Sequence, residues 1–310
     1  MLGVEPAIRS LNLVNLVLMK KLLIGLLAAA ASLPGQKALE RQIATIAREA
    51  QGKVAVACRL PGTDLRCNLL AQSRPPMQSV FKLPLVVTVL HLIESGKLTL
   101  DQPVRFLKSD RILPKTYSPL QDKYPDADVD VPLRELAQSA VALSDNTASD
   151  ILLRIVGGPA VVDQYLAALG IRGFHLRDGE AGLHRDPRAQ YRNWLQPSAA
   201  VAFLRLLNDQ PPLNPPNTEL LFQWMRESPT GAKRLKADLP SGTVVMHKTG
   251  TSGVTQGLAH ATNDIGLIRL PDGRHLAIAV FVTDSRADEA VRESVIARIA
   301  KAVYDAAIRK

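Results

Sequence analysis

The amino-acid sequence predicts a mixed α/β (α+β) fold: an antiparallel sheet built from both termini and flanked by helices, with an inserted all-helical region. Two observations carry this prediction. Strand-like apolar segments occur near the two ends of the chain, whereas residues from about 80 to 240 follow a helical periodicity. Since strands must pair to bury their apolar faces, the two ends are expected to form one sheet, with the helical segment inserted between them.

The individual elements are expected in the following order. Residues 36–51 predict an amphipathic helix, because Leu39, Ile43 and Ile46 share one face. Residues 54–58 and 65–70 flank Pro61-Gly62-Thr63-Asp64, a turn sequence that favours a hairpin. Further strands are expected at 243–246, 257–270 and 275–283, and a final helix at about 286–308. We therefore expect a sheet region of residues 36–75 plus 240–310 and a helical region of 76–239, which together form one compact catalytic unit.

The N-terminal residues 1–35 have the layout of a signal peptide and leader. Met19-Lys20-Lys21 is basic, the next ten residues are apolar, and Ala29-Ala30-Ala31-Ser32 is a small-residue cleavage zone. A transmembrane anchor is the alternative, but the lysines leave each apolar stretch too short to span a bilayer. We expect a secreted protein, periplasmic after cleavage, without stable membrane insertion.

Composition argues against several classes of function. The formal charge is +9, yet the basic residues are scattered and aromatic residues make up only 4%, so no nucleic-acid partner is expected. The six histidines show no HExxH or HxHxD spacing, and two cysteines are too few for a zinc cluster. No metal or organic cofactor is implied.

Three short motifs carry the chemistry. Ser79-Val80-Phe81-Lys82 is an S-x-x-K, whose i, i+3 spacing places serine and lysine on one helix face. Ser144-Asp145-Asn146 follows an apolar helix, and Lys248-Thr249-Gly250 ends a predicted strand. Alone, each has an ordinary explanation: a capped helix start, a helix cap or loop, and the end of an edge strand. In this order, the three are the signature of class A β-lactamases and penicillin-binding proteins.

The chain resembles the class A serine β-lactamases from about residue 36 to 308. Several runs are similar to the PER-type subgroup, namely Pro114-Lys115-Thr116-Tyr117-Ser118-Pro119, Tyr191-Arg192-Asn193-Trp194 and Thr262-Asn263-Asp264-Ile265-Gly266. Glu180, in Asp178-Gly179-Glu180-Ala181-Gly182-Leu183-His184, matches the family's Ω-loop glutamate. Penicillin-binding proteins lack this glutamate, so Glu180 favours a hydrolase; the ordinary explanation is a solvated loop carboxylate.

The resemblance implies a role for each matching residue. Ser79 is the nucleophile, and the backbone N–H groups of Ser79 and Thr251 form the oxyanion hole. Lys82 or Glu180, the latter through a water, takes the serine proton, and Glu180 activates the hydrolytic water. The remaining roles are proton relay by Ser144, carboxylate binding by Lys248, Thr249 and Thr251, side-chain amide binding by Asn146, and an entrance wall formed by Tyr117.

Two departures from the family pattern concern the Ω-loop. His184 stands where most members have asparagine, as in the PER-type subgroup; it either helps to fix the water or packs in the loop. The arginine–aspartate ion pair that is common in the family's Ω-loop is missing, because Asp178 and Asn193 occupy its two positions. By resemblance to the PER-type subgroup, Asp150 is expected to hydrogen-bond Asn193 and so to tether the loop.

The hairpin also predicts a disulfide. If Pro61–Asp64 is the turn, counting back along both strands places Cys58 opposite Cys67, near enough to bridge. Two free buried thiols are the alternative.

The expected partners are β-lactam small molecules, which a monomer would hydrolyse and so confer antibiotic resistance. A penicillin-binding receptor that stays acylated, a D,D-peptidase or a promiscuous esterase are the alternatives.

Overall fold

A computed structural model describes residues 34–112 and 116–309. The chain divides into two units, 1–38 and 39–310, and the described residues of the first are the beginning of helix α2. Apart from Pro34 and Gly35, the expected signal peptide and leader lies outside the described residues.

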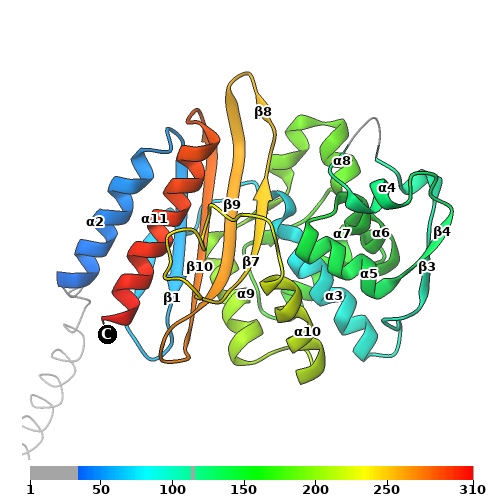
Figure 1. Ribbon diagram of the computed structural model, residues 1–310, viewed down its shortest axis with the longest axis horizontal. Coiled ribbons are helices and arrows are strands. Elements are labelled where there is room, and N and C mark those ends of the chain that lie inside the picture. The colour runs from blue at the N-terminus through cyan, green and yellow to red at the C-terminus, as the bar shows by residue number, and fades with distance from the viewer. Residues whose placement is uncertain (1–33, 113–115, 310) are drawn as a thin grey trace, which may run out of the picture. The chain divides into compact units, whose positions relative to one another are not determined.

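The elements alternate along the chain as follows (Figure 1). The helices are α2 (Pro34–Arg48), α3 (Lys82–Glu94), α4 (Pro119–Lys123), α5 (Leu133–Gln138), α6 (Asn146–Val156), α7 (Pro159–Ala168), α8 (Glu180–Arg185), α9 (Pro197–Asp209), α10 (Pro215–Arg226) and α11 (Glu289–Ile308), with short helical turns η1 (Gln78–Phe81), η2 (Lys108–Asp110), η3 (Ser139–Leu143) and η4 (Pro187–Arg192). The strands are β1 (Lys53–Arg59), β2 (Arg66–Leu69), β3 (Pro103–Phe106), β4 (Val129–Pro132), β5 (Phe174–His175), β6 (Trp194–Leu195), β7 (Val245–Thr251), β8 (Val254–Thr255), β9 (Leu258–Arg269) and β10 (His275–Ser285).

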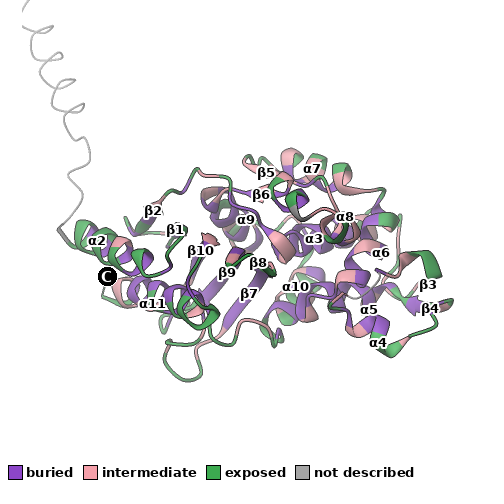
Figure 2. Cartoon of the chain, turned by 90° about the horizontal axis from the view of Figure 1, so that it is seen from above, coloured by how far each residue is buried: buried purple, intermediate pink, exposed green. Residues whose placement is uncertain are grey.

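The main sheet joins the two ends of the chain, which confirms the predicted fold class. Its strand order is β2-β1-β10-β9-β7, with β8 paired to β9, and every pairing is antiparallel. N-terminal β1 pairs with C-terminal β10 over seven residues, from Lys53 opposite Thr283 to Arg59 opposite Ala277. The central strands are buried almost throughout because helices cover both of their faces (Figure 2).

Each face of the sheet has its own hydrophobic core. On one face α2, from Leu39 onward, and α11 pack against alternate strand residues such as Val56 and Ile278. On the other face the intervening residues, among them Ala57 and Phe281, pack against α3, α9 and the rest of the helical region. The period-2 alternation of the strands therefore assigns neighbouring residues to different cores.

The inserted region is mainly helical but contains two short antiparallel pairs that the sequence analysis did not predict. Strand β3 pairs with β4, and β5 pairs with β6. Each of these strands has two to four residues, too few for a period-2 pattern to stand out. The β5–β6 pair closes the neck of the loop formed by residues 176–193. This is the Ω-loop, and it contains Glu180.

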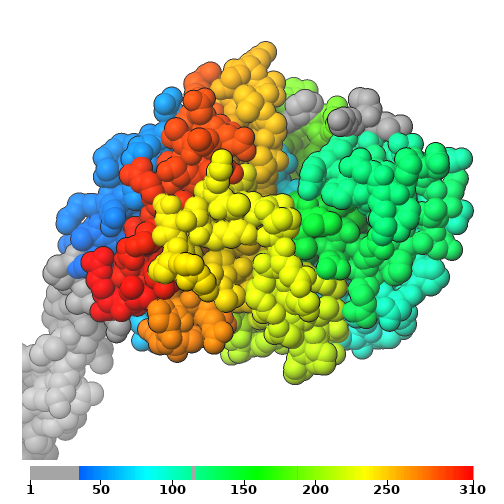
Figure 3. Space-filling view, viewed as in Figure 1, coloured from blue at the N-terminus to red at the C-terminus, as the bar shows by residue number. Residues whose placement is uncertain are grey.

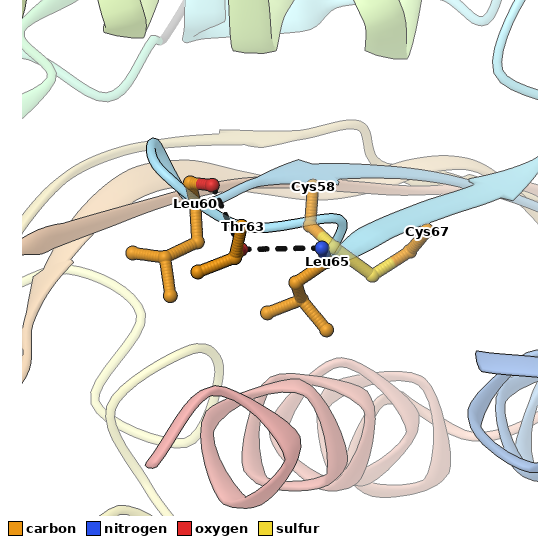
Figure 4. Close-up of a disulfide and its surroundings, with 5 residues drawn as sticks. All are labelled: Cys58, Leu60, Thr63, Leu65 and Cys67. Carbon is orange, nitrogen blue, oxygen red and sulfur yellow. Dashed lines mark hydrogen bonds between the residues drawn. A yellow bond between two sulfur atoms is a disulfide. The ribbon is translucent and has the colours of Figure 1, made fainter. Parts of the chain in front are cut away.

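The hairpin at the start of the sheet has the predicted register, and the disulfide is confirmed. Cys58 lies opposite Cys67 in the β1–β2 ladder, their Cα atoms are 4.9 Å apart, and the two residues are bonded (Figure 4). The turn is held by Thr63, whose hydroxyl donates to the Leu60 carbonyl oxygen at 2.9 Å and accepts from the Leu65 N–H at 3.2 Å.

The connection from α10 to β7, residues 227–244, lies across the sheet beside α11 (yellow in Figure 3). In the stretches 34–112 and 116–309, no individual helix is both long and apolar enough to cross a bilayer, and the bent pair α6–α7 meets that test only when its two helices are taken together.

Candidate active site

Ser79 lies in the helical turn η1, which leads directly into α3. The preceding residue, Gln78, has a left-handed backbone with φ of +48°. Strand β7 passes very close to this turn: a Cβ on Gly250 would lie 2.4 Å from the Met77 carbonyl oxygen. The glycine of the K-T-G motif therefore permits the close backbone approach that holds the serine turn against the sheet.

Ser79 and Lys82 converge on a single carboxylate oxygen. The Ser79 hydroxyl donates to Glu180 Oε1 at 3.2 Å, and Lys82 Nζ lies 2.9 Å from the same oxygen. Lys82 also donates to the Ser144 carbonyl oxygen at 2.8 Å and to Asn146 Oδ1 at 2.6 Å. The S-x-x-K spacing thus joins serine and lysine through Glu180 rather than by a direct hydrogen bond. Because the Lys82 side chain is fully buried and that of Glu180 is 9% exposed, bulk water screens this ion pair little.

Ser144 follows the π-helical turn η3 and has a left-handed backbone, with φ of 61° and ψ of 31°. Its neighbour Asp145 caps α6 by accepting a hydrogen bond from the Ala148 N–H at 2.8 Å. The S-D-N triplet is therefore a helix cap, as its composition suggested, and also part of the site. The cap places the Ser144 hydroxyl 2.8 Å from Lys248 Nζ, and Asn146 Nδ2 donates to Thr116 Oγ1 at 2.7 Å.

The K-T-G residues lie on β7, whose described course extends through Thr251, further than predicted. Lys248 is fully buried and donates to Ser144 Oγ and to the Thr249 carbonyl oxygen. Burial, and secondarily the nearby Lys82 ammonium, hold the pKa of Lys248 well below its usual range, while two carboxylates oppose this effect. Thr249 Oγ1 is 2.8 Å from Thr230 Oγ1.

Asp150 holds the start of α8. Its two carboxylate oxygens accept hydrogen bonds from the N–H groups of Glu180 at 2.7 Å and Ala181 at 2.8 Å. Negative charge at a helix N-terminus is favourable, but desolvation by burial, and secondarily the Glu180 charge, raise the pKa of Asp150 to about 6. Asp150 therefore positions the backbone of the Ω-loop glutamate directly.

The expected hydrogen bond between Asp150 and Asn193 is not formed. Asn193 instead bonds the neck of its own loop: its Oδ1 accepts from the N–H groups of Arg177 and Asp178, and its Nδ2 donates to the Asp178 carbonyl oxygen at 2.7 Å. The prediction was wrong because loop backbone groups occupy the polar atoms of both side chains. A different ion pair also supports the loop, since Arg192 contacts both carboxylate oxygens of Asp178, at 2.8 and 3.0 Å.

A cavity of roughly 260 Å³ opens beside Ser79. Its walls contain most of the residues predicted from the motifs: Ser79, Tyr117, Ser144, Asn146, Glu180, Thr249 and Thr251. Tyr117 is 59% exposed at its entrance. An adjoining cavity of roughly 220 Å³ shares Asn146, Glu180 and Thr251 and is also lined by exposed His184. A larger groove of roughly 720 Å³ over α4 and α5 contains none of these residues.

Two site features were missed by the sequence analysis. Arg234 lines the main cavity and donates to Thr251 Oγ1 at 2.9 Å, while its Nε contacts Glu293 Oε1 at 3.1 Å. Tyr191 of η4 donates to Asp284 and lies 2.7 Å from His260 Nδ1, which links the Ω-loop to β9 and β10. Arg234 belongs to none of the motifs, and Tyr191 was noted only as part of the Tyr191-Arg192-Asn193-Trp194 run; the partners of Tyr191 lie 69 and 93 positions away, so no local signal indicates this contact.

Within the part of the chain that the structure describes, no group of three or more His, Cys, Asp or Glu side chains is arranged to hold a metal ion. The available chemistry is that of a serine hydroxyl and a lysine that share one carboxylate oxygen, with a second buried lysine bonded to Ser144, beside an open cavity. These are the components of nucleophilic acyl transfer: a nucleophile, a base that accepts its proton, and cations that attract an anionic substrate.

Comparison with known proteins agrees with this chemistry. Residues 38–307 match the model of the β-lactamase enzyme family. The chain is 41% identical over 273 residues to the extended-spectrum β-lactamase PER-1 of Pseudomonas aeruginosa, which covers 88% of each chain. It is 37% identical over 237 residues to β-lactamase VEB-1 of the same organism, which covers 76% of this chain and 79% of VEB-1.

Solved structures agree in fold. A β-lactamase from Chitinophaga pinensis superposes with a TM-score of 0.84 at 41% identity, covering 87% of this chain and 99% of that one. A class A β-lactamase from Bacteroides cellulosilyticus superposes with a TM-score of 0.84 at 34% identity, covering 90% of this chain and 100% of that one. The chain therefore belongs to the β-lactamase enzyme family, among its class A serine enzymes.

Proposed function

We propose that this protein hydrolyses β-lactam antibiotics through an acyl-enzyme on Ser79 and thereby confers resistance to them. The observation that carries the proposal is the shared Glu180 oxygen, which lies within hydrogen-bond distance of both Ser79 and Lys82. A carboxylate in this position can accept a proton from a hydroxyl group beside it. The same carboxylate can then activate a water beside the ester.

In the acylation step, Ser79 Oγ forms a bond to the lactam carbonyl carbon, and the C–N bond of the ring breaks. The serine proton passes to Glu180. Lys82, which contacts Glu180 and Ser144, gives one proton to the departing nitrogen through Ser144 and regains one from Glu180, so that Glu180 is again a carboxylate when the ring has opened. The contacts of Lys82 support Glu180 as the base: Lys82 Nζ faces three acceptor oxygens. These match the three donors of an ammonium group, which has no lone pair to accept a proton. Backbone N–H groups of Ser79 and Thr251 stabilise the oxyanion, each contributing about 2.7–4 kcal/mol.

In the deacylation step, Glu180 removes a proton from a water, whose oxygen bonds to the acyl carbon, and then returns that proton to the Ser79 oxygen as the ester bond breaks. The net reaction adds one water across the lactam amide. Asp150 supports this step because it holds the Glu180 backbone. His184, on the wall of the adjoining cavity, assists in placing the water.

Substrate recognition follows from the charges of the cavity. Lys248, Thr249 and Thr251 bind the substrate carboxylate, and Arg234 adds a second cation next to Thr251. Asn146 binds the side-chain amide, and Tyr117 forms one wall of the entrance. The buried disulfide favours an oxidising compartment such as the periplasm, and we propose that the enzyme acts there as a monomer.

The main alternative is a penicillin-binding receptor or D,D-peptidase of the same fold. Pre-steady-state kinetics with a chromogenic cephalosporin distinguish them: a lactamase turns over many equivalents, whereas a receptor gives one stoichiometric burst and a stable adduct by intact-protein mass. Ser79→Gly is the matched control and should abolish both. A burst without turnover in the unmodified enzyme would overturn the proposal, as would cleavage of a D-Ala-D-Ala peptide faster than that of any lactam.

A further inference from the structure

A chain of three hydroxyl groups runs from the wall of the main cavity into the protein. Thr249 Oγ1 lies 2.8 Å from Thr230 Oγ1, and Thr230 Oγ1 lies 2.9 Å from Ser228 Oγ. Ser228 Oγ in turn donates to the Ala142 carbonyl oxygen at 2.9 Å. Thr249 and Thr230 line the cavity beside Ser79, whereas Ser228 is buried. The steps proposed above use Thr249 but neither Thr230 nor Ser228.

The chain joins three parts of the fold that are distant in sequence. Thr249 is the central residue of K-T-G on β7, Thr230 and Ser228 belong to the α10–β7 connection, and Ala142 lies in η3. Gly231, next to Thr230, has a left-handed backbone with φ of +63°, and a Cβ there would lie 2.6 Å from Thr249 Cγ2. The glycine therefore lets the connection approach β7 closely enough for the hydroxyls to meet.

The carbonyl at the inner end determines the direction of the hydrogen bonds. A hydroxyl has one proton to donate, and a carbonyl oxygen only accepts. Ser228 gives its proton to Ala142, so its contact with Thr230 needs the proton of Thr230. The contact between Thr230 and Thr249 then needs the proton of Thr249. In the free enzyme the Thr249 hydroxyl therefore donates into the chain and not toward a substrate.

Two neighbouring hydroxyls of the cavity are arranged in the opposite way. Thr251 Oγ1 accepts from the Arg234 guanidinium at 2.9 Å, and Ser144 Oγ accepts from the Lys248 ammonium at 2.8 Å. Because these cations only donate, both hydroxyls keep their own protons for another acceptor. Thr249, which binds the same substrate carboxylate as Thr251 in the proposed function, bonds another hydroxyl instead. It must turn its proton out of the chain before it can donate to an anion.

Reversal of the chain supplies this proton without moving an oxygen atom. When Thr249 donates to a carboxylate, Thr230 can donate to Thr249 and Ser228 to Thr230, so three hydrogen bonds exist before and after. The acceptor at the end of the chain changes from the neutral Ala142 carbonyl to an anion. Charge-assisted hydrogen bonds are roughly twice as strong as neutral ones, and hydrogen bonds in a row strengthen one another. An anionic substrate therefore favours the reversed direction.

We propose that Thr230 is a positioning residue for the substrate carboxylate. In the free enzyme it accepts a hydrogen bond from Thr249, and with an anionic substrate it donates one to Thr249, whose hydroxyl then faces the carboxylate. Thr230 acts on the substrate only through Thr249. The inference rests on the proposed function, because it concerns how the same site recognises its anionic substrate. It gives a role to a residue outside the three motifs.

The test is single-turnover acylation of Thr230→Val by a chromogenic cephalosporin, followed by stopped flow over a range of concentrations. Valine keeps the shape and removes the hydroxyl. The half-saturating concentration should rise by about three- to tenfold, as expected for the loss of one hydrogen bond, whereas the maximal acylation rate should change much less. Thr230→Ser keeps the hydroxyl and should restore the wild-type concentration. Thr243→Val is the matched control, because it removes a hydroxyl of the same connection that bonds the Pro240 carbonyl oxygen, and it should match wild type.

Two further measurements separate the hydroxyl chain from packing. The methyl ester of the same cephalosporin has no negative charge, so Thr230→Val and wild type should show the same half-saturating concentration for it. In a Thr249→Val background, adding Thr230→Val should have no further effect, because Thr230 acts only through Thr249.

A wild-type half-saturating concentration in Thr230→Val overturns the inference, as does an equal rise with the ester or a further rise in the Thr249→Val background. If Thr230→Val does not fold, Thr230→Ala removes the same hydroxyl and is judged by the same outcomes. A wild-type protein that is acylated without turnover contradicts the proposed function alone, because the comparison uses only the acylation step.

Discussion

Asp150 links the fold of the Ω-loop to its chemistry, and Asp150→Asn separates the two. In the folded protein the pKa of Asp150 is raised to about 6, chiefly by burial, from an ordinary value near 3.8. Each pKa unit corresponds to about 1.36 kcal/mol of stability, so ionised Asp150 costs the fold up to about 3 kcal/mol. Asparagine has the same shape without the charge and is free of this cost.

The sign of the pH dependence follows from the direction of the shift. Because the folded-state pKa is raised, the folded protein binds the Asp150 proton more tightly than the unfolded chain does. The contribution of Asp150 to the free energy of unfolding is fully present below about pH 4 and is lost as the pH rises to about 6 and above. Urea unfolding from pH 4 to 8 should show wild type and variant converging at pH 4, with the variant gaining up to about 3 kcal/mol by pH 7.

Turnover should change in the opposite direction. The carboxylate accepts from two N–H groups, those of Glu180 and Ala181, whereas asparagine has one oxygen and would turn its NH₂ toward the other donor. Loss of a charge-assisted bond of about 1.5–3 kcal/mol should slow deacylation by about ten- to a hundred-fold. Single-turnover acylation and steady-state kcat measure the two steps separately. Parallel stability curves at all pH values, or wild-type deacylation in the variant, would refute the reasoning.

Three further predictions concern other parts of the chain. Glu180→Gln should slow both acylation and deacylation, because the amide lacks the basic oxygen that serves both steps, and turnover should fall by about two to four orders of magnitude; wild-type kcat would contradict this. Replacing Cys58 and Cys67 together by serine should lower the free energy of unfolding by about 2–3 kcal/mol, because a short closed loop is lost. Urea denaturation of the variant, and of the unmodified protein with and without reductant, measures this difference. Tyr191→Phe removes the hydroxyl that donates to Asp284, so Ω-loop amides should exchange hydrogen faster while Tm stays within a few degrees; unchanged exchange would show that this contact does not hold the loop.

Much of the fold and most of the residues that line the candidate site follow from the sequence, because their signals are local. The turn Pro61-Gly62-Thr63-Asp64 determines the hairpin register, and the register alone places Cys58 opposite Cys67. The motifs are likewise short, and each has a recognisable context: a helix start, a helix cap and a strand. Their order along the chain identified the class of reaction before any distance was known.

Tertiary structure decided how these residues meet. The contact between Ser79 and Glu180 joins residues 101 positions apart, and the one between Ser144 and Lys248 spans 104. No local pattern encodes that Asp150 bonds the Glu180 backbone rather than Asn193, because hydrogen bonding in a buried loop depends on which donors the whole fold leaves unpaired. Arg234 likewise gains its place only when the α10–β7 connection folds over the sheet. Sequence determines which groups are present and their local conformation, whereas burial and long-range packing determine their partners and their charge.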